Sequence, residues 1–579
     1  MRSLRALAVL AAAFTSALVV RGTAATGGAR GAPAVTGPPP RILVVIVVDQ
    51  LAAWMAEERW PTLPPDGGFA RLRREGLYAR ELRFGSAATD TAPGHSALFT
   101  GAVPHESGIL ANEVIPAGGG DPVSFLADPT TRTVMAEGGP GVKASSSLAA
   151  LRVETLADVL ASARPDAAIV SLSLKDRGAL FGAGRHPTAA LWLDPELGAF
   201  VTSTAITSRF PDWAAHLGDG ATVRAAMARG WQLGDRAWVA AHAETADDAA
   251  GEAAYQGLGR TFPHAIGSVK ALRATPEGDA LLFELASAAA AQIEAARGRP
   301  GLLALSLSSH DYIAHLFGPH SWEAWDELAK LDHALAGFLA RLDQLFGEDN
   351  YAVMLTGDHG SNALPELSRE RPSPWCRGAA GRPDHWERSC APRQRLIPSA
   401  VVPALEGALG EALGAARGPF VAGIADPLVF LTPRGRDLPA ADERTLVRVA
   451  TDFLRHRFAI AHVVDLRSAP ARCPALADES WRALVCRGTR AGGPGDLYMV
   501  VSPGTFFDPR LAPGAGTSHG SPYLYDRAVP LLIRAPGRVR PGEVRQRPVA
   551  FTAFARTAAA LLDVRPPEAA ADGEDLTRL

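Results

Sequence analysis

Short runs of apolar residues recur along this chain, and polar residues follow directly after most of them. Six such runs, the first reading ILVVIVVD, span residues 42–49, 167–177, 302–311, 351–360, 496–504 and 529–537. The runs are continuously hydrophobic, as strands covered on both faces must be. Segments with helical periodicity lie between them, such as residues 321–347, whose apolar side chains recur on one helical face. The pattern predicts an α/β fold, a doubly wound, mostly parallel sheet sandwiched by helices.

With 579 residues, the chain is long enough for one large α/β domain with insertions. We expect a main domain over residues 41–579, interrupted at about 205–267 and 362–495. The second insertion is rich in Arg, Pro and Ala and holds all four cysteines. In a doubly wound sheet the ligand crevice lies beyond the carboxyl ends of the strands. We therefore expect the insertions to form a cap over this crevice.

The N-terminus has the three-part pattern of a secretory signal peptide. Two arginines precede an apolar run over residues 6–20, and small residues follow it. The run is too short to span a bilayer stably. A signal peptide over residues 1–25 is therefore the prediction, with a buried N-terminal helix as the alternative, and the Gly/Ala/Pro tract over 26–40 is typical of a flexible leader. We expect an exported protein, periplasmic or secreted, without a stable membrane span.

The cysteines suit an exported chain. Two local disulfides, Cys376 with Cys390 and Cys473 with Cys486, are the simplest arrangement, although four cysteines allow three connectivities. No CxxC pair occurs in the sequence, so a thiolate zinc site has little support.

Positive and negative residues are nearly balanced, with 58 Lys and Arg against 61 Asp and Glu. No global field therefore favours nucleic acid or an anionic membrane as a partner, and any anion site must be local. Only four basic residues are lysine, and one stands in SLSLKDRG, where Lys175 and Arg177 lie two apart at a predicted strand end. Side chains at this spacing on a strand project to the same side, where two cations suit an anion. A solvated strand end with Asp176 as counter-ion is the alternative.

Carboxylate and imidazole side chains stand at or soon after the predicted strand ends. The six residues are Asp49, Asp311, His315, Asp358, His359 and His519. Since the ligand crevice lies at this edge of the sheet, these groups can converge there. Their mixture of oxygen and nitrogen donors suits Zn²⁺. Taken singly, each is equally typical of a helix N-cap or a surface turn, but in this order they predict a metal site.

The stretch TAPGHSALFTG, residues 91–101, offers a hydroxyl with no basic neighbour. Coordination to a metal ion can deprotonate such a hydroxyl, which makes Thr91 the candidate nucleophile. A helix N-cap is the alternative for Thr91 and is compatible with it, because a helix N-terminus favours an anion. Asn112 in GILANEV is a candidate amide donor, although a lone Asn is more often a turn residue. The rival hydroxyls to Thr91 are those of Ser86, Thr89 and Ser96.

Together these residues resemble the alkaline phosphatase superfamily, in particular its threonine-nucleophile branch of nucleotide pyrophosphatases/phosphodiesterases and PafA-type alkaline phosphatases. The motifs occur in family order and cover nearly the whole chain from about Arg41: VVIVVDQL, TDTAPGHSALFTGAVPHESGI, SLSLKDRGALFGAG, SSHDYIAHLFGP, TGDHG and GTSHGS. The sulfatase branch needs a cysteine or serine in a CxPxR-type motif, and no cysteine precedes position 376. The resemblance implies an alkaline phosphatase-like fold.

The resemblance also implies two zinc ions. The ligands of one ion are expected to be Asp311, His315 and His519. Those of the other are expected to be Asp49, Asp358, His359 and the nucleophile Thr91. Diesterases of the superfamily lack the Lys/Arg pair. The presence of the pair in this chain therefore favours phosphate monoesters as substrates. The groups that hold the phosphoryl oxygens are then Asn112, Lys175 and Arg177.

The predicted function is a zinc-dependent alkaline phosphatase that hydrolyses small-molecule phosphate monoesters through a phosphothreonine intermediate. Thr91 attacks phosphorus first, and water then cleaves the phosphothreonine. A phosphodiesterase, nucleotide pyrophosphatase or other phosphoryl or phosphonate hydrolase with the same two metals is the alternative, and a non-catalytic secreted metal-binding protein is the remote one. Asp90 fits less well, because a carboxylate pointing into the site would slow the binding of an anionic substrate or help to bind a third cation, and we expect it to face away from the site.

Overall fold

The computed structural model describes residues 37–116, 118–296, 298–370, 394–508, 511 and 513–578. The predicted signal peptide, most of the predicted leader and the predicted Cys376–Cys390 disulfide lie outside these residues. Within the described ranges, no helix combines the length and apolar character needed to cross a membrane.

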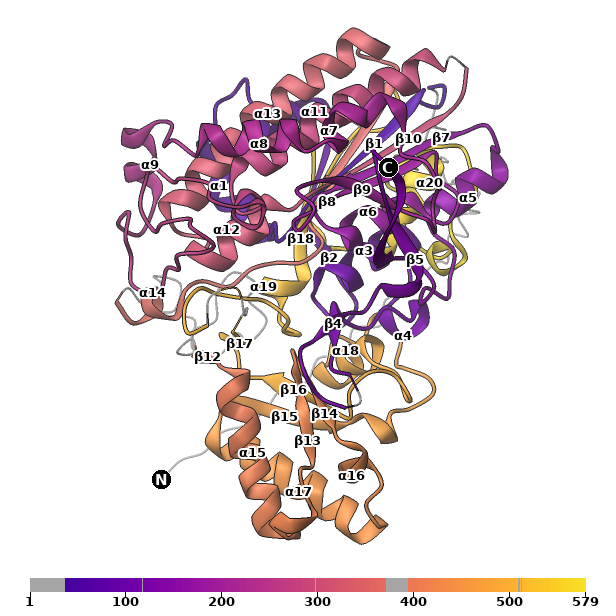
Figure 1. Cartoon of the computed structure of the whole chain (residues 1–579). Helices are drawn as coiled ribbons and strands as arrows, with labels where there is room; N and C mark the ends of the chain where they lie inside the picture. Colours follow the sequence, from indigo (N-terminus) through magenta and orange to yellow (C-terminus); the bar gives the residue numbers. More distant parts are fainter. Residues whose placement is uncertain are drawn as a thin grey trace, which may run out of the picture.

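A twelve-stranded sheet forms the centre of the main body (Figure 1). In spatial order its strands are β19 (Glu543–Arg545), β2 (Leu77–Arg83), β18 (Ala528–Arg534), β11 (Tyr351–Thr356), β1 (Ile42–Val48), β10 (Gly301–Leu307), β7 (Ala168–Ser173), β8 (Ala189–Asp194), β9 (Ala199–Ser203), β5 (Ala127–Met135) and β6 (Gly139–Ser146), while β20 (Val549–Ala550) pairs with β2. The five central strands, from β11 to β8, run parallel to one another. The α/β, mostly parallel sheet predicted from the sequence is confirmed.

Continuous burial explains why the central strands were recognisable in the sequence. All residues of β1, β7, β10, β11 and β18 are buried. Alternate residues of β1 enter two different cores, Val44 on one face of the sheet and Val45 on the other. The first core is covered by α11 (Pro276–Ala295) and α13 (Trp322–Phe346), and the second by α3 (Thr91–Thr100), α6 (Asp176–Ala183) and α20 (Thr552–Leu561).

The helix predicted over residues 321–347 is α13. Its first turn is capped by the Ser321 side chain, which accepts a hydrogen bond from the Ala324 N–H, and the helix is followed directly by Gly347, whose φ is +78°. Residues of the first insertion form α7 (Ala215–Gly218), α8 (Ala221–Arg229) and α9 (Arg236–His242). Of these, α8 packs on α11 and α9 on α13.

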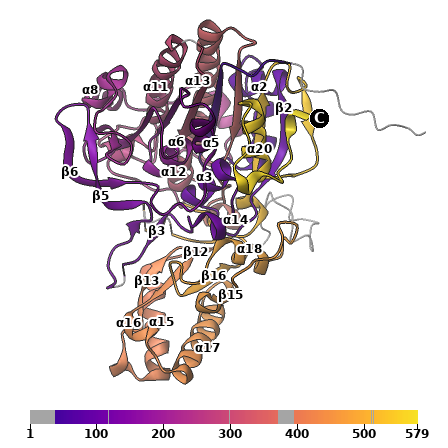
Figure 2. The ribbon, with the colours of Figure 1, turned by 90° about the vertical axis from the view of Figure 1, so that its right-hand side faces the viewer.

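A smaller lobe lies below the main body in Figure 1 and Figure 2. It holds a four-stranded sheet of β13 (Val421–Ala425), β14 (Leu428–Leu431), β16 (Leu497–Val501) and β15 (Ile460–Asp465), with α15 (Pro398–Leu413) and α17 (Ala440–Arg457) packed on it. The predicted Cys473–Cys486 disulfide is confirmed and joins residues near this sheet.

The run at residues 496–504 was expected to belong to the main sheet, and this prediction was wrong. It forms β16 in the smaller sheet, so the lobe continues past residue 495. Both faces of β16 are covered: Met499 packs in the lobe core against α15 and α17, and Tyr498 packs in another cluster with Ala87 and Leu484. A continuous apolar run indicates two covered faces but does not identify the sheet.

Candidate metal centre and active site

The structure brings the six predicted metal ligands to the carboxyl edge of the central strands. Asp49 follows β1, Asp358 and His359 follow β11, and Asp311 and His315 lie on α12 (Ser309–Phe317), which begins just after β10. His519 reaches them from the loop that precedes α19 (Leu524–Arg527). All six side chains are buried.

Five of these residues form two groups whose ligand atoms lie within 4.8 Å of one another. One group is Asp311, His315 and His519, and the other is Asp49, Asp311 and His359. Asp311 therefore belongs to both. Asp358 lies beside the second group, with its Oδ2 3.7 Å from His359 Nε2. Its Oδ1 accepts a hydrogen bond from the Gln50 N–H at 3.0 Å.

Each histidine is oriented by a backbone carbonyl. In all three rings Nδ1 donates to a main-chain oxygen, which directs Nε2 at the carboxylates. The accepting carbonyls are those of Thr517 for His315 at 2.8 Å, Thr89 for His519 at 2.7 Å and Gly360 for His359 at 3.1 Å. This is the orientation that metal-binding histidines adopt.

Buried polar atoms of the site lack hydrogen-bond partners. Among the described residues, Asp49 Oδ1 and His359 Nε2 are buried without a hydrogen-bond partner and lie 3.3 Å from each other. Buried polar atoms of this kind are costly unless something binds them. The donor set therefore fits divalent cations such as zinc, with oxygen and imidazole nitrogen as ligands.

Lys175 joins the two groups. Its Nζ lies 2.6 Å from Asp49 Oδ2 and 2.6 Å from Asp311 Oδ2, inside the protein. Burial acts to lower the pKa of Lys175, but the Asp311 and Asp49 carboxylates outweigh it and raise that pKa. Burial acts to raise the pKa of Asp311, while Lys175 and His315 bring it well below its usual range. The ammonium thus neutralises carboxylates of the site.

The strand argument for Lys175 and Arg177 was wrong, because β7 ends at Ser173. Lys175 is the N-cap of α6, and Arg177 lies in the first helical turn. Both still line one cavity. Arg177 Nε is buried without a hydrogen-bond partner in the described chain, and its guanidinium lies 3.9 Å from Asp176. Arg177 is therefore weakly paired, as a ligand-binding cation can be.

Thr91 is the first residue of α3 and is buried. The N-cap is Asp90, whose backbone is extended, so the N-cap alternative for Thr91 was wrong. The first turn of α3 packs on the Asp358 backbone, where a Cβ at Gly94 would lie 2.3 Å from the Asp358 carbonyl oxygen. Asn112 Oδ1 accepts a hydrogen bond from the Ala92 N–H at 2.8 Å, which holds the amide beside Thr91.

Two further residues that the sequence argument missed hold the carboxylates in place. Gln50 Nε2 donates to Asp311 Oδ1 at 2.8 Å, and Gln50 has a φ of +67°, unusual for a residue with a side chain. His95 Nδ1 lies 3.0 Å from Asp358 Oδ2. Both residues stand inside motifs quoted above, Gln50 in VVDQL and His95 in TAPGH. His95 also follows Thr91 by one helical turn, a spacing from which its position beside the site could have been predicted.

Asp90 lies beside His519, next to the ring nitrogen that is turned to the backbone and not to the clustered carboxylates. Its Oδ1 lies 3.5 Å from His519 Nδ1. The reason is local: Thr89, the preceding residue, supplies the carbonyl that holds His519, so the same turn carries Asp90 to that ring. Burial raises the pKa of Asp90 to about 6, although the nearby His359 and Arg177 act to lower it.

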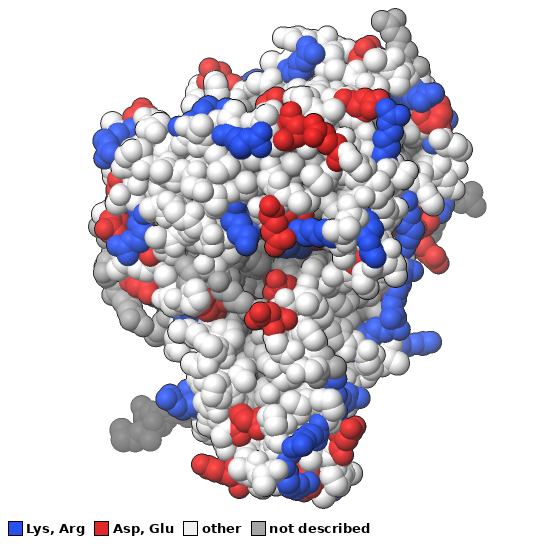
Figure 3. All heavy atoms as spheres, in the orientation of Figure 1, with Lys and Arg blue, Asp and Glu red and all other residues white. Residues whose placement is uncertain are grey.

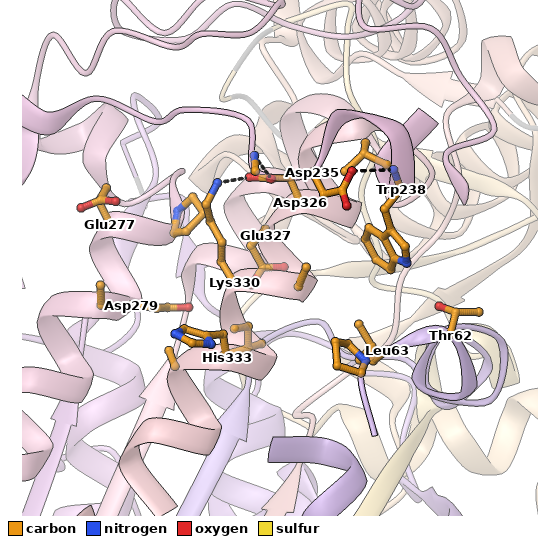
Figure 4. Close-up of a pocket in the computed structure, with 18 of the residues that line it drawn as sticks. Thr62, Leu63, Asp235, Trp238, Glu277, Asp279, Asp326, Glu327, Lys330 and His333 are labelled. Atoms are coloured by element: carbon orange, nitrogen blue, oxygen red, sulfur yellow. Dashed lines mark hydrogen bonds and ion pairs between the residues drawn. The ribbon is translucent and has the colours of Figure 1, made fainter. Parts of the chain in front are cut away.

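A larger cavity, of about 690 Å³, lies elsewhere, among α9, α11 and α13 (Figure 4). Its carboxylates are occupied by protein groups. Asp279 accepts from the N–H groups of Ser308 and Ser309, and Glu327 Oε2 lies 2.7 Å from His310 Nδ1. These contacts support the start of α12. The outer face in Figure 3 mixes both charge signs and is hollowed between the main body and the lobe.

Comparisons with known proteins identify the family and the fold of this chain. Residues 43–377 match the model of the type I phosphodiesterase / nucleotide pyrophosphatase family. The chain is 29% identical over 542 residues to a calcium-transporting ATPase of Myroides odoratus, covering 91% of this chain and 92% of that protein. It is 28% identical over 537 residues to alkaline phosphatase PhoV of Synechococcus elongatus, covering 91% of each.

The chain is also 32% identical over 341 residues to alkaline phosphatase PafA of Elizabethkingia meningoseptica, covering 56% of this chain and 60% of PafA. A crystal structure of wild-type PafA superposes with a TM-score of 0.79 at 24% identity, over 94% of this chain and 99% of that one. The resemblance predicted from the motifs is confirmed. With its alkaline phosphatase-like fold, the chain belongs to the type I phosphodiesterase / nucleotide pyrophosphatase family.

Proposed function

We propose that this protein is an exported, zinc-dependent alkaline phosphatase that hydrolyses small-molecule phosphate monoesters through a phosphothreonine intermediate. Its relatives make it a phosphoryl hydrolase of the alkaline phosphatase and nucleotide pyrophosphatase superfamily. The observation that carries the finer proposal is the position of two cations, Lys175 and Arg177, beside the clustered carboxylates and imidazoles.

Two zinc ions are proposed to bind the clustered residues. Asp311, His315 and His519 would hold one ion. Asp49, Asp358, His359 and Thr91 would hold the other. When bound, the two ions supply Lewis-acid charge that lowers the pKa of the threonine hydroxyl and of a water molecule.

The reaction then uses two displacements at phosphorus. Thr91 Oγ1 loses its proton and forms a bond to phosphorus while the bond from phosphorus to the ester oxygen breaks, and that oxygen takes up a proton and leaves as the alcohol. The N-terminus of α3 favours the negative charge that Thr91 carries before the attack. Water next attacks the phosphothreonine, releasing phosphate and restoring the hydroxyl. Positioning and charge stabilisation are the main catalytic contributions in such reactions.

Preference for monoesters follows from the charge of the substrate. A monoester carries one more anionic oxygen than a diester, and Lys175 and Arg177 supply cations for it, with Asn112 as a neutral donor. The competing proposal is a phosphodiesterase, which the description of the matching family favours.

One experiment distinguishes a phosphate monoesterase from a phosphodiesterase. Initial rates of hydrolysis of an aryl phosphate monoester and the matching diester are measured with the zinc-loaded protein. A strong monoester preference supports the proposal, whereas a diester preference retains the metal site and refutes the role given to Lys175, Arg177 and Asn112.

Export and a single catalytic domain over residues 41–579 are part of the proposal. The Cys473–Cys486 disulfide supports export, because disulfides persist in oxidising compartments.

A further inference from the structure

A cavity of about 280 Å³ extends away from the phosphoryl-binding cations. It begins at Lys175 and Arg177, is bounded by Trp192 within β8, and reaches Lys143 on β6 and Arg273 next to α10 (Val269–Leu272). Four cationic side chains therefore line one small cavity. The further inference concerns Arg273, which the reaction described above does not use.

Arg273 is a cation without a carboxylate partner in the described part of the chain. Its Nε is buried and has no hydrogen-bond partner there. The neighbours of its guanidinium are two phenols: it lies over the Tyr312 ring, 4.9 Å from the centroid, and interacts with Tyr255. Neutral phenols leave its positive charge uncompensated.

The other charges of the cavity are already engaged. Lys143 Nζ lies 2.7 Å from both Asp194 and Glu196. Asp176 accepts hydrogen bonds from the Ser146 hydroxyl and from the Arg177 N–H. Lys175 is bound by carboxylates of the metal centre. The excess positive charge of the cavity therefore comes from the two arginines, each with a buried Nε that lacks an acceptor.

Arg273 is also close to the reacting groups. Lys175 Nζ lies 4.7 Å from the centroid of the Tyr312 ring that Arg273 covers, so both cations contact one side chain. An oxyanion that reaches Arg273 could thus belong to the molecule whose phosphoryl group lies at Lys175 and Arg177. A guanidinium suits such a group, because its planar fork matches carboxylate and phosphate oxygens.

We propose that Arg273 is a specificity-determining residue that binds a second anionic group of the substrate, so that the protein prefers phosphate monoesters carrying a carboxylate or a second phosphate. This inference rests on the proposed function, in which Lys175 and Arg177 hold the reacting phosphoryl group. The shared chemistry is an oxyanion a few bonds from the phosphorus.

Binding of three non-hydrolysable phosphonates to the zinc-loaded protein tests this directly by isothermal titration calorimetry. Propylphosphonate has one anionic group, 3-phosphonopropanoate adds a carboxylate, and propane-1,3-bisphosphonate adds a second phosphonate. In the wild type the two double anions should bind more tightly than propylphosphonate. Arg273→Ala should weaken them about tenfold or more while changing propylphosphonate less than twofold. The double anion that loses more identifies carboxylate or phosphate as the preferred group.

Two variants guard against a purely structural effect. Arg273→Lys keeps the charge and should retain part of the preference. Arg236→Ala is the matched control, because Arg236 also lies over an aromatic ring, that of Trp322, outside this cavity. It should leave all three affinities unchanged.

The proposal is wrong if the wild type binds the double anions no more tightly than propylphosphonate, or if Arg273→Ala weakens all three ligands alike. The second result would mean that Arg273 acts only by holding Tyr312. Failure of the proposed function is distinguishable, because it appears as diester preference in the turnover assay and not in these affinities.

Discussion

Lys175→Ala is the substitution with the most specific expected outcome. The ammonium lies 2.6 Å from carboxylate oxygens of both Asp49 and Asp311. Without metal, its removal leaves these buried carboxylates uncompensated, and breaking a buried pair in this way costs about 3–5 kcal/mol. With zinc bound, the ions themselves compensate the carboxylates. We therefore expect a large loss of stability in the metal-free protein and a much smaller loss in the zinc-loaded protein.

The effect of the substitution on catalysis should be large in the zinc-loaded protein, where its effect on stability is small. In the zinc-loaded protein the alanine variant lacks one donor to the phosphoryl oxygens, and the loss of such a donor lowers the rate about 10²-fold or more. Turnover of an aryl diester, which has one anionic oxygen fewer, should fall less. The same variant is thus nearly normal in stability and strongly impaired on monoesters when zinc is present.

The assay measures the thermal unfolding midpoint with excess zinc and with chelator, together with initial rates on monoester and diester. Lys330→Ala is the matched control, since Lys330 also forms an ion pair with a buried carboxylate, that of Asp326, away from the metal centre. It should lower the midpoint by the same amount in both conditions and leave turnover unchanged. Equal loss of stability for Lys175→Ala in zinc and in chelator, or monoester turnover within a few-fold of wild type, would refute the reasoning.

Three other predictions concern the nucleophile, the metal groups and a buried acid. Thr91→Ala should lower turnover at least about a thousandfold and abolish acid-stable labelling of the protein by a radioactive monoester; persistent labelling would identify another hydroxyl. Asp311 belongs to both groups of clustered ligands, but the proposed assignment gives it to one ion only, so Asp311→Asn and His315→Ala should each lose one equivalent of zinc in elemental analysis and keep the other, and loss of both equivalents from Asp311→Asn would contradict that assignment. Burial, reinforced by Glu323, raises the pKa of Glu252 from 4.5 to about 9. The folded protein therefore retains a proton that the unfolded chain releases, and this contribution to stability is lost as pH rises between these values. Glu252→Gln should make the thermal midpoint fall less steeply over that range, and an unchanged pH slope would argue against a neutral Glu252.

The central strands could be predicted because their burial is visible locally. A strand such as β1 has both faces covered, so each of its residues is apolar and the run ends where the chain leaves the sheet. Polar residues after such runs meet at one edge, which is why Asp49, Asp358 and His359 could be expected together. The motifs around Thr91 and Lys175 then identified the family, which the comparisons confirm.

Contacts between distant segments were decided only by the tertiary structure. Lys175 meets carboxylates 126 and 136 residues away, and Gln50 reaches Asp311 across 261 residues. Nothing in the local pattern distinguishes β16, which joins the lobe, from a strand of the main sheet.

The sequence by itself therefore determined which segments are buried and which polar residues stand at their ends, because hydrophobic periodicity is a property of one segment. The tertiary structure decided which segments pair, that Asp311 serves both groups and that Asp90 faces His519. These depend on the relative placement of several elements, and side-chain distances of a few ångströms follow from packing that no single segment encodes.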